Sequence, residues 1–475
     1  MHLRGYLRYA IQEFMHRLRR GKRRAWDHGR WILPVLALAV ALAGVPSGPL
    51  RDDDHASLYR GGADVPLPTA ALLEPTTAPA PERALLNVEA ATVTPQPVPP
   101  TATPTSAPTD PTATPEPVPV TLSEAVRDRA RERAEAAYGA LWQHFYLPDD
   151  RLFSEQAPNE HWFPYAYLWP LSQTLGVSNE MAALPDAEPQ HLFDVLSVVG
   201  AIELYFDDDR EPPAYSSYIP PPDGHENDRF YDDNAWIGLE LLSAYELTGY
   251  ELALVRAGQI FDYLVSGWGT GEERPNPGGI FWVESSRNRD RNTVSTAPAA
   301  KLGLLLAEQE DDPLRRRYYL DWSGRMYDWV EANLRSPDSL YWDHIGEDGT
   351  IDQTIFTYNQ GAMLGTSLLM HRATGDERYL DRAEQIGQAA LARWDIDGLL
   401  AQPIAFNAIL FGDLLELDAE RPDPAYVELI VTYADRIWAG HRDAATGLVT
   451  INSPTSLLDQ SAAARIYAML AGYGS

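Results

Sequence analysis

The stretch that decides the fold is Phe230-Tyr231-Asp232-Asp233-Asn234-Ala235-Trp236, which opens a nearly all-apolar run that continues to Leu247. A helix that is apolar on all sides is a buried helix, and the two aspartates lie in its first turn. An acidic residue there ordinarily accepts free backbone N–H groups and meets the positive end of the helix dipole. Two adjacent carboxyls also repel when ionised, so one should hold its proton more tightly. A pair of carboxyls with different proton affinities is what glycosidases use for catalysis. Capping and catalysis therefore both explain the pair.

Apolar helical segments recur from residue 121 to the end of the chain, and strand-like alternation is almost absent. Within them, Thr248–Ile260 matches Thr374–Ile386 at an offset of 126 residues. Each copy is a glycine turn followed by an amphipathic helix, and each follows a far more apolar helix, as in a helical hairpin with an inner and an outer member. We expect twelve helices near 121–146, 164–175, 188–206, 231–248, 250–267, 293–309, 312–335, 356–373, 376–393, 402–416, 424–440 and 456–472.

Six such hairpins closed into a ring form an all-α (α/α)6 barrel, which is the fold we predict for residues 121–475. An open solenoid is the rival architecture, but it predicts a more uniform repeat than this chain shows. The same 126-residue offset can be applied to the inner helices that precede the two copies. It aligns residues 232–234 with Tyr358, Asn359 and Gln360. Other inner helices open near Asn292 and near Asp459-Gln460. In a closed ring these starts converge at one end, so their polar side chains predict a cleft lined with hydrogen-bonding groups.

Aromatic side chains occur in the loops expected at the same end of the ring. Sugar rings pack their C–H faces on aromatic rings, while their hydroxyls need amide and carboxylate partners. Ordinary core packing is the alternative explanation for many of the 13 tryptophans. The loop aromatics are Tyr165, Tyr167, Trp169, Phe281, Trp282, Tyr341 and Trp342.

Composition and charge narrow the possible functions. The chain has 475 residues and no cysteine, which excludes disulfides, a thiol nucleophile and thiolate metal sites. Its net charge is -30, and because residues 1–30 carry nine Lys/Arg against two Asp/Glu, the remainder carries -37. So acidic a body is not expected to bind nucleic acid. No His-Glu-x-x-His motif occurs, and we expect neither a metal nor a cofactor.

The N-terminal part of the chain has the composition of a targeting and tethering region. A basic segment, 1–30, precedes the apolar segment 31–48, and this order places the N-terminus in the cytoplasm. Segment 31–48 is either a retained membrane anchor or a signal peptide cleaved after Ala43. Residues 49–120 are rich in Pro and Thr and predict a disordered linker. We therefore expect an extracytoplasmic body, tethered or secreted; a buried helix behind a nucleic-acid-binding arm is the alternative.

Several motifs taken together resemble glycoside hydrolase family 76, the endo-acting α-1,6-mannanases. Tyr231-Asp-Asp-Asn-Ala-Trp236 resembles its central motif, and Gly278-Gly-Ile-x-Trp282 resembles its second. Arg291-Asn292 with Ser295, Phe356-Thr-Tyr-Asn-Gln-Gly361 and Leu457-Leu-Asp-Gln-Ser461 resemble three further ones. The resemblance implies an (α/α)6 barrel in which the first aspartate is the nucleophile and the second the acid/base. The loop 165–173 has no counterpart in that pattern.

The resulting hypothesis is a monomeric, retaining endo-glycosidase that cuts an α-linked polysaccharide or oligosaccharide, with α-1,6-mannan as the expected substrate and with Asp232 and Asp233 as catalytic residues. Two alternatives stay open. One is a cell-surface module that binds glycans without cutting them. The other is a sugar epimerase on the same barrel, which usually needs a cleft histidine, for which His344 is the nearest candidate. The expected substrate-binding residues are Tyr231, Asn234, Trp282, Asn292, Tyr358, Asn359, Gln360, Trp169 and Tyr167.

Overall fold

Helices dominate the computed structural model, which describes residues 122–474 apart from 162, 272–274 and 452. All described residues belong to one unit that begins at Pro115. The predicted basic segment 1–30, the membrane segment 31–48, the whole linker 49–120 and its boundary with the barrel lie outside the described residues. Within the described ranges, no helix combines the length and the hydropathy needed to cross a bilayer.

The twelve predicted helices are all present in the described part of the chain. The bounds of three helices differ clearly from the prediction. Helix α4 begins at Leu168, after an extended Tyr167, and continues to Ala183 instead of 175. Helix α5 ends at Ile202 instead of 206, and α13 continues to Glu420 instead of 416. A short helix, α12 (Ile396–Leu400), and a 3-10 turn, η3 (Glu203–Tyr205), were not predicted. The twelve are α3 (Glu124–Phe145), α4 (Leu168–Ala183), α5 (Pro189–Ile202), α6 (Tyr231–Thr248), α7 (Glu251–Ser266), α8 (Thr293–Gln309), α9 (Pro313–Asn333), α10 (Thr357–Thr374), α11 (Glu377–Arg393), α13 (Ile404–Glu420), α14 (Pro424–Gly440) and α15 (Leu457–Gly472).

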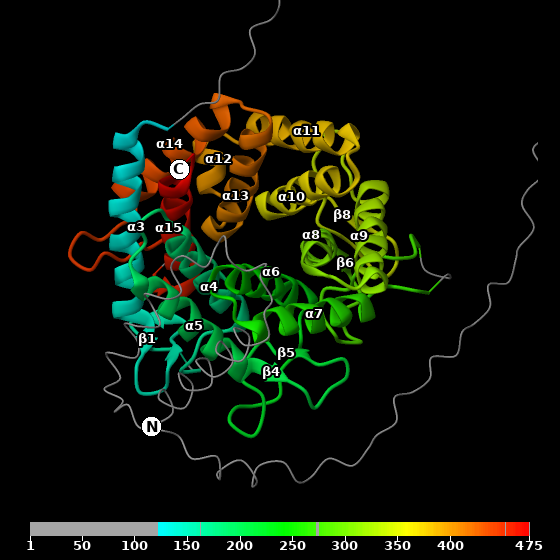
Figure 1. The fold of residues 1–475 in the computed structure, drawn as a ribbon, viewed down its shortest axis with the longest axis horizontal. Helices are drawn as coiled ribbons and strands as arrows, with labels where there is room; N and C mark the ends of the chain where they lie inside the picture. Colours follow the sequence, from blue (N-terminus) through cyan, green and yellow to red (C-terminus); the bar gives the residue numbers. More distant parts are fainter. Residues whose placement is uncertain (1–121, 162, 272–274, 452, 475) are drawn as a thin grey trace, which may run out of the picture. The chain divides into compact units, whose positions relative to one another are not determined.

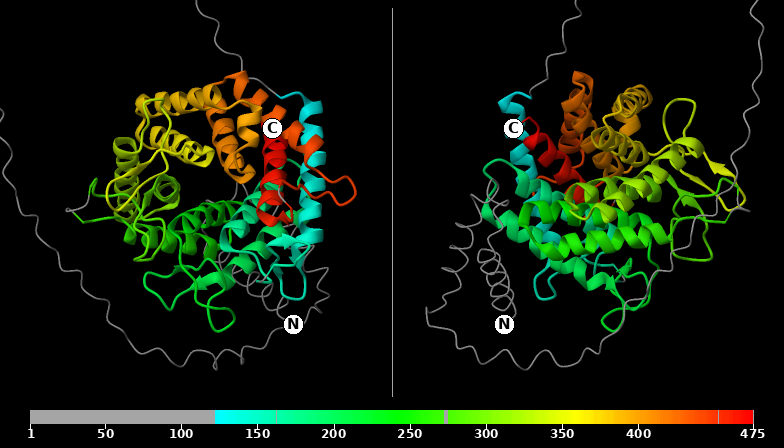
Figure 2. Two further views of the ribbon diagram at one scale, coloured as in Figure 1. Left: turned by 180° about the vertical axis from the view of Figure 1, so that it is seen from behind. Right: turned by 45° about the vertical axis from the view of Figure 1, so that its right-hand side comes forward.

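The helices form two concentric rings. Helices α4, α6, α8, α10, α13 and α15 each contact the next, and α15 contacts α4, so the inner ring is closed (Figure 1). Helices α5, α7, α9, α11 and α14 lie outside the inner helices that precede them, as the reverse view also shows (Figure 2). The sixth outer helix is α3, which packs on α15, so the first and last helices complete the ring. The predicted (α/α)6 barrel is confirmed, and the open solenoid is excluded.

Strands are confined to the loops. In the described ranges each has two residues and each pairing is antiparallel. The pairs are β1 (Tyr146–Leu147) with β2 (Leu152–Phe153), β3 (Gln156–Ala157) with β9 (Thr455–Ser456), β4 (Phe206–Asp207) with β5 (Ala214–Tyr215), and β7 (His344–Ile345) with both β6 (Arg291–Asn292) and β8 (Ile351–Asp352). The β3–β9 pair joins the loop after α3 to the start of α15.

The predicted 126-residue repeat is visible in backbone geometry. Gly249 ends α6 with φ 68°, and Gly375 ends α10 with φ 69°; both lie in the left-handed region that L side chains rarely adopt. In the last helical turn, the N–H of Gly249 donates to the carbonyl of Tyr245 and the N–H of Gly375 donates to the carbonyl of His371, both at 2.7 Å. The two turns therefore terminate equivalent inner helices in the same way.

The repeat also includes a partly buried side-chain cluster. The Tyr215 hydroxyl donates to Glu203 Oε1 at 2.6 Å, and Arg256 Nη2 donates to Glu203 Oε2 at 2.9 Å. In the second copy Tyr341 donates to Glu331, and Arg382 Nε donates to Glu331 Oε1 at 2.9 Å. The two tyrosines are 126 residues apart, and so are the two arginines. In each copy, the tyrosine and the arginine of the repeat therefore bind the same glutamate.

Two ion pairs lie inside the inner ring, and each reaches across an intervening helix. Lys301 of α8 pairs with Asp413 of α13 past α10, and Arg465 Nη1 of α15 lies 2.7 Å from Glu240 Oε1 of α6, past α4. A glycine makes room in each intervening helix. A Cβ on Gly365 would lie 2.0 Å from Asp413 Oδ1, and one on Gly176 would lie 2.5 Å from Arg465 Nη1.

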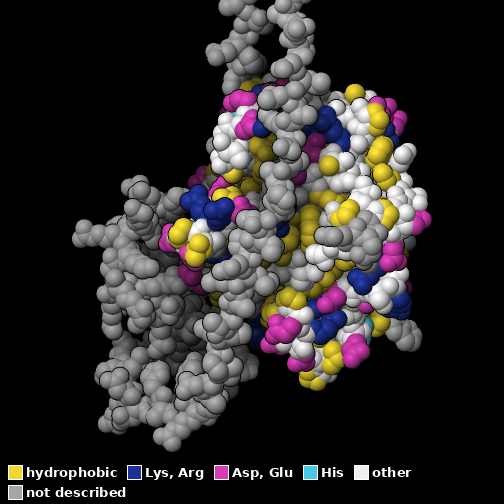
Figure 3. All heavy atoms as spheres, turned by 90° about the vertical axis from the view of Figure 1, so that its right-hand side faces the viewer, with side chains coloured by type: hydrophobic (Ala, Val, Ile, Leu, Met, Phe, Trp, Pro, Cys, Tyr) yellow, Lys and Arg dark blue, Asp and Glu magenta, His cyan; other side chains and the backbone are white. Residues whose placement is uncertain are grey.

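The outer surface of this unit carries charges of both signs. On the face shown in Figure 3, acidic and basic side chains surround a strip of hydrophobic ones. Most large hydrophobic side chains of the described residues are buried, and those left exposed include Leu204, Val255, Trp282 and Leu314. Trp282 belongs to the second sequence motif, so its exposure needs an explanation other than core packing.

Candidate active site

The starts of the inner helices meet at one end of the barrel, as predicted. Thr357, at the start of α10, donates its hydroxyl to Asn407 Oδ1 of α13 at 2.9 Å. The ring of Phe406 in the first turn of α13 lies 5.8 Å from that of Trp169 at the start of α4. The charge of Asp232 in α6 acts on Tyr358 of α10. These two contacts, together with the electrostatic influence of Asp232 on Tyr358, indicate that four inner helix starts surround one site.

Asp232 and Asp233 occupy the second and third positions of α6. The N-cap is Phe230, which supplies no side-chain cap. Of the two aspartates, only Asp232 accepts a free backbone N–H of the first turn, so capping does not account for the pair. Asp232 Oδ2 accepts the indole N–H of Trp282 at 3.0 Å, and its Oδ1 accepts the backbone N–H of Asp233 at 3.0 Å. No donor among the described residues bonds to the Asp233 carboxyl. Two adjacent carboxyls thus have very different partners.

The difference in hydrogen-bond partners gives the carboxyls of Asp232 and Asp233 different proton affinities. Burial raises the pKa of Asp232 to about 7, while the hydrogen bonds from Trp282 and Asp233 act in the lowering direction. Burial also raises the pKa of Asp233 well above its ordinary value, and the charge of Asp232 raises it further, with no hydrogen bond to offset them. Since donors stabilise only the charged form, Asp232 is the member that ionises and Asp233 the member that retains the proton.

Asp343 is a third carboxylate at the site, and it was not among the residues predicted from the sequence. Its Oδ1 accepts Asn359 Nδ2 at 3.1 Å, and its Oδ2 lies 2.8 Å from His344 Nδ1. Its charge raises the pKa of Asp232, and the hydrogen bond to Asp343 is the main reason that the pKa of His344 is raised. The one available signal was the neighbouring Tyr341-Trp342 pair.

Aromatic rings form a row from the aspartates toward α4. Tyr358 stacks on Phe406 with ring centroids 3.9 Å apart and planes 1° apart, and Trp169 continues the row. Burial and the charges of Asp343 and Asp232 raise the pKa of Tyr358. Phe406 was not predicted from sequence. Tyr167 lies instead in a separate loop cluster, with its ring 5.6 Å from that of Tyr218.

Three side-chain oxygens at the helix starts are buried without a partner among the described residues. They belong to Asn292, which is the N-cap of α8, to Ser295 in the first turn of α8, and to Asn359 in the first turn of α10. Asn292 pairs with His344 across β6 and β7, and Asn359 binds Asp343. Unpaired buried oxygens are costly and indicate donors that the protein itself does not supply.

Arg291 supports the loop that carries Trp282. Its guanidinium is fully buried and donates to the carbonyls of Pro275 at 3.0 Å and Asn276 at 2.6 Å. Gly278 and Gly279 follow with φ values of 107° and 75°, where a Cβ on either would meet the Trp329 ring within 2.6 Å. The two glycines are thus required by backbone conformation and by close packing. Their loop delivers Trp282 to Asp232.

Asn234 and Gln360 are corrections to the predicted set of substrate-binding residues. Both are fully buried and their amides are occupied. Asn234 Nδ2 donates to the carbonyls of Tyr215 and Phe230 at 2.9 and 2.8 Å, and its Oδ1 accepts the Tyr215 N–H at 2.9 Å. Gln360 makes the same three bonds, to Tyr341 and Phe356, at 2.7 to 3.0 Å. Each holds the loop before its helix, and neither has a donor left for a sugar.

Tyr231 is a third correction. It is buried, and its ring stacks on Tyr263 of α7 with centroids 4.5 Å apart. Gly267, at the end of α7, packs so closely that a Cβ there would lie 2.5 Å from the Tyr231 ring. The residue therefore packs α6 against α7 and directs its ring to the outer helix, whereas its neighbour Asp232 bonds to Trp282 of the Gly278–Trp282 motif.

Comparison with protein-family models matches residues 131–405, more than half of the chain, to glycosyl hydrolase family 76. The chain belongs to glycosyl hydrolase family 76. A family 76 enzyme from a bovine Bacteroides thetaiotaomicron strain shares the fold with a TM-score of 0.64 at 24% identity, over 73% of this chain and 78% of that one. The Salegentibacter sp. α-1,6-mannanase has a TM-score of 0.58 at 23% identity, over 71% of this chain and 98% of that one.

Two further similarities limit what family 76 membership and fold imply by themselves. A mannan endo-1,6-α-mannosidase of Candida glabrata is 29% identical over 114 residues, which span 22% of this chain and only 25% of that protein. A D-mannose isomerase has the same fold, with a TM-score of 0.56 at 14% identity, over 73% of this chain and 97% of that one. Barrels of this kind therefore host more than one chemistry, and the site has to distinguish them. Within the described residues, no group of three His, Asp or Glu side chains could hold a metal ion.

Proposed function

We propose that the chain is a retaining endo-glycosidase of α-1,6-linked mannan, in which Asp232 is the nucleophile and Asp233 the general acid and base. The observation that carries the proposal is the asymmetry of the pair. Asp232 accepts two hydrogen bonds and ionises, while Asp233 accepts none from the described residues and keeps its proton. In the first step Asp232 attacks the anomeric carbon while Asp233 protonates the leaving oxygen. In the second, Asp233 takes a proton from the water that releases the sugar.

Relatives support the substrate and the residues. One solved structure is an inactive variant of the Salegentibacter α-1,6-mannanase with two consecutive aspartates replaced by asparagine, in complex with α-1,6-mannotriose. It shares the fold with this chain at 22% identity. Asp232 and Asp233 are the consecutive aspartates at the start of an inner helix here. The Candida glabrata protein is also named for an endo-1,6-α-mannosidase activity.

Substrate contacts are proposed for the groups that surround the pair and retain free surface or free bonding capacity. Trp282 has 37% of its surface exposed and orients Asp232 through its indole, so its ring provides a packing face beside the nucleophile. Tyr358 and Trp169 belong to the aromatic row and would stack on successive sugar rings. Asn292 and Asn359 have buried oxygens without a partner, and sugar hydroxyls are suitable donors to them.

The proposal is tested by incubating the purified protein with a panel of linkage-defined oligosaccharides and measuring new reducing ends. We expect cleavage of α-1,6-mannotetraose, and loss of at least about 10³-fold in kcat for Asp232→Asn and for Asp233→Asn, since each removes one of two groups that act together. Asp338→Asn, at an exposed loop position, is the matched control and should retain full activity. Near-normal turnover in either catalytic variant would contradict the assignment.

Two other functions predict different outcomes in the same assay. A glycan-binding module would bind the oligosaccharide and release no reducing ends. An epimerase or isomerase would convert a monosaccharide, and His344, which is half-buried beside Asp343, is the candidate proton carrier for it. Release of shorter oligosaccharides with no isomerised monosaccharide would exclude both.

We also propose that the barrel lies outside the cytoplasmic membrane. The support is the order of a basic segment, an apolar segment at 31–48 and a Pro/Thr-rich stretch before the domain. Protease added to cells whose outer layers have been permeabilised should digest the barrel if it is tethered outside. Protection of a cell-associated barrel under those conditions would indicate a cytoplasmic protein.

A further inference from the structure

An ion pair joins the segment before the paired aspartates to the segment behind Trp282. Arg229 lies three residues before Asp232, and its guanidinium is fully buried. Its Nε donates to Glu284 Oε2 at 2.6 Å, and its Nη2 donates to Glu284 Oε1 at 2.9 Å. Glu284 lies two residues after Trp282. Two parallel bonds between a guanidinium and a carboxylate fix both the distance and the plane of the carboxylate.

The backbones beside this ion pair are also bonded to each other. The Glu284 N–H donates to the Arg229 carbonyl, and the Tyr231 N–H donates to the Trp282 carbonyl, both at 2.9 Å. Phe230 lies between these two bonds in an antiparallel bridge, and its ring centroid is 5.1 Å from that of Trp282. This register sets Trp282 against the first residue of α6, so that its indole reaches the carboxyl that follows in the helix.

Arg229 is held in place by contacts that do not involve Glu284. Its Nη1 donates to the carbonyls of Pro212 at 2.8 Å and Arg210 at 3.3 Å. Its guanidinium lies 4.8 Å from the centre of the Tyr263 ring, and the Tyr263 hydroxyl donates to the Arg229 carbonyl at 3.2 Å. The arginine is therefore the fixed member of the pair, and Glu284 is the member that ties the loop to it.

The bond between Trp282 and Asp232 depends on where this loop lies. It is 3.0 Å long, and N–H···O bonds weaken outside about 2.7–3.2 Å, so a shift of the loop by a few tenths of an ångström would weaken it. Among the hydrogen bonds that Asp232 accepts, that of the indole lowers its pKa most. The other groups that act on Asp232 are acidic: Asp233 in the same helix, and Asp343 and Tyr358 from neighbouring elements.

We propose that Arg229 and Glu284 are positioning residues, whose ion pair holds the indole of Trp282 on Asp232 and so keeps the nucleophile hydrogen-bonded. Arg291 fixes the beginning of the same loop, through the carbonyls before Gly278, and the ion pair fixes its end. The role of Asp232 as nucleophile rests on the proposed function. The contact between the ion pair and the indole does not, so the two can be tested separately.

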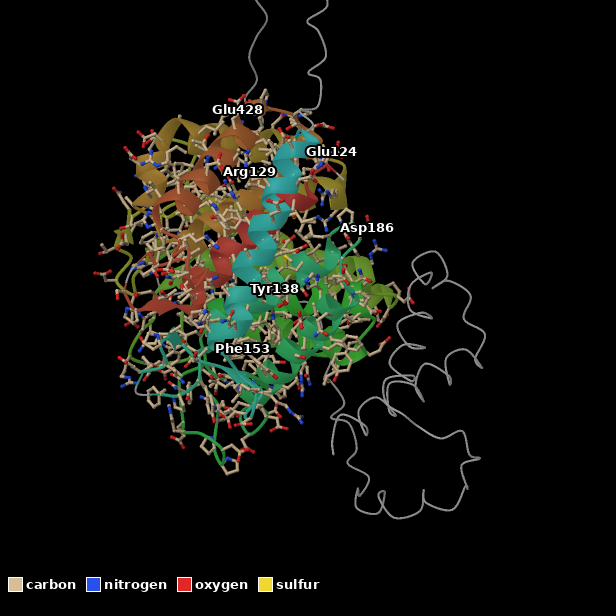
Figure 4. All side chains as sticks on the ribbon, turned by 90° about the vertical axis from the view of Figure 1, so that its left-hand side faces the viewer. Glu124, Arg129, Tyr138, Phe153, Asp186 and Glu428 are labelled. Atoms are coloured by element: carbon tan, nitrogen blue, oxygen red, sulfur yellow. The ribbon has the colours of Figure 1, made fainter. Side chains whose placement is uncertain are left out.

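Two variants of Glu284 release the end of the loop. Glu284 has 32% of its side chain exposed, so Glu284→Ala leaves no large void, and Arg229 keeps its carbonyl partners. Glu284→Gln keeps the shape and one acceptor. Asp435→Ala is the matched control, because Asp435 also pairs with two arginines, Arg133 and Arg129, on the outer wall between α3 and α14. Figure 4 shows Arg129 on α3 at that wall.

The direct test is the Trp282 indole signal in ¹H–¹⁵N NMR of the full chain labelled with ¹⁵N-tryptophan. Trp282→Phe identifies that signal among the 13 tryptophans. We expect it to shift with pH as Asp232 ionises, with a pKa of about 7, and Asp232→Asn should abolish the shift. Glu284→Ala should reduce the shift by roughly half or more, because the bond weakens steeply with distance and angle. Glu284→Gln should reduce it less, and Asp435→Ala should leave it unchanged.

The pH dependence of kcat/KM for α-1,6-mannotetraose provides a second measurement. Since the indole lowers the pKa of Asp232, a weakened bond raises that pKa, so Glu284→Ala should move the acidic limb to higher pH. Adding Glu284→Ala to Trp282→Phe should move the limb no further, because no indole N–H is left to position. A residue that supports only the fold would leave the limb in place, as we expect for Asp435→Ala.

Each failure has a separate signature. A Trp282 signal that keeps its full pH-dependent shift in Glu284→Ala would overturn the positioning role, and Glu284→Gln gives the same result if the alanine variant does not fold. A further displacement of the limb in the double variant would also overturn it, since Glu284 would then act by another route. If the chain releases no reducing ends from mannotetraose, the proposed function fails instead, and the NMR titration still tests the ion pair.

Discussion

At the scale of single residues, the chemistry depends on how differently two adjacent carboxyls are treated. Trp282 and the Asp233 N–H stabilise a charged Asp232, whereas burial and the neighbouring charge favour a proton on Asp233. The active form therefore carries one proton on the pair, and the pair titrates with two apparent pKa values. Activity should be lost below the lower one, as Asp232 becomes protonated, and above the upper one, as Asp233 loses its proton.

The Trp282→Phe variant tests the hydrogen bond that the indole N–H of Trp282 donates to Asp232. Because the indole N–H lowers the pKa of Asp232, its removal should raise that pKa and move the acidic limb of the kcat/KM profile to higher pH. We also expect a loss of about tenfold in kcat/KM at the optimum, the cost of one hydrogen bond to a charged group. A pH–rate profile of wild type and variant gives the result, and an acidic limb that stays in place would show that the indole does not act on the nucleophile.

Asp343→Asn should move the acidic limb of the kcat/KM profile to lower pH, opposite to the shift expected for Trp282→Phe. The charge of Asp343 raises the pKa of Asp232, so a neutral amide should lower it and extend activity to more acidic pH. The maximal rate should also fall, because Asn359 and His344 lose the carboxylate that holds them. The pH–rate profile again provides the measurement. A shift to higher pH would contradict the electrostatic account.

At the scale of helices and loops, the fourth residue of an inner helix holds the loop that precedes it. Asn234 and Gln360 each pair with both backbone groups of a tyrosine 19 residues earlier, and Thr296 of α8 accepts the backbone N–H of Ile280 at 3.0 Å. Gln460 of α15 accepts from Val449 at 2.7 Å. The loops that bear the site are thus fixed by side chains that never touch it.

Asn234→Ala should therefore reduce stability more than substrate affinity. It leaves the N–H and C=O of Tyr215 buried without partners, at a cost of about 3 kcal/mol in the free energy of unfolding. Urea denaturation measures that cost, and KM for mannotetraose, measured well below the unfolding midpoint, should change less than threefold. A large rise in KM with unchanged stability would restore Asn234 as a substrate ligand.

At this scale, features that depend on a local, periodic pattern could be predicted from the sequence, whereas features that depend on contacts between distant residues could not. The apolar period gave the twelve helices, and the repeat aligned Asn234 with Gln360 correctly. Their shared role as loop supports was missed, because polar residues above an apolar helix suit a cleft equally well. Asp343 was missed because it has no counterpart in the repeat: Ser217 stands 126 residues earlier.

At the scale of the whole domain, the barrel interior is held by ion pairs that pass over glycines. Gly365→Ala should disrupt Lys301–Asp413, since the new methyl would lie 2.0 Å from Asp413 Oδ1. Separating a buried pair costs about 3–5 kcal/mol, far more than the gain of roughly 1 kcal/mol from replacing a helical glycine. Gly324→Ala, in α9 with no atom within 4 Å of the new Cβ, is the control and should be neutral or stabilising. Thermal unfolding distinguishes them, and equal melting temperatures would contradict the role of Gly365.

The central claim about the whole molecule is that the barrel brings a charged Asp232 and a protonated Asp233 to one glycosidic bond and cuts it by double displacement. The most direct test is proton NMR of the first product released from α-1,6-mannotetraose, recorded before the anomers equilibrate. Attack by Asp232 followed by attack of water inverts the anomeric carbon twice, so the account predicts the α anomer. A first product with the β anomer would show single displacement by water and would contradict Asp232 as the nucleophile.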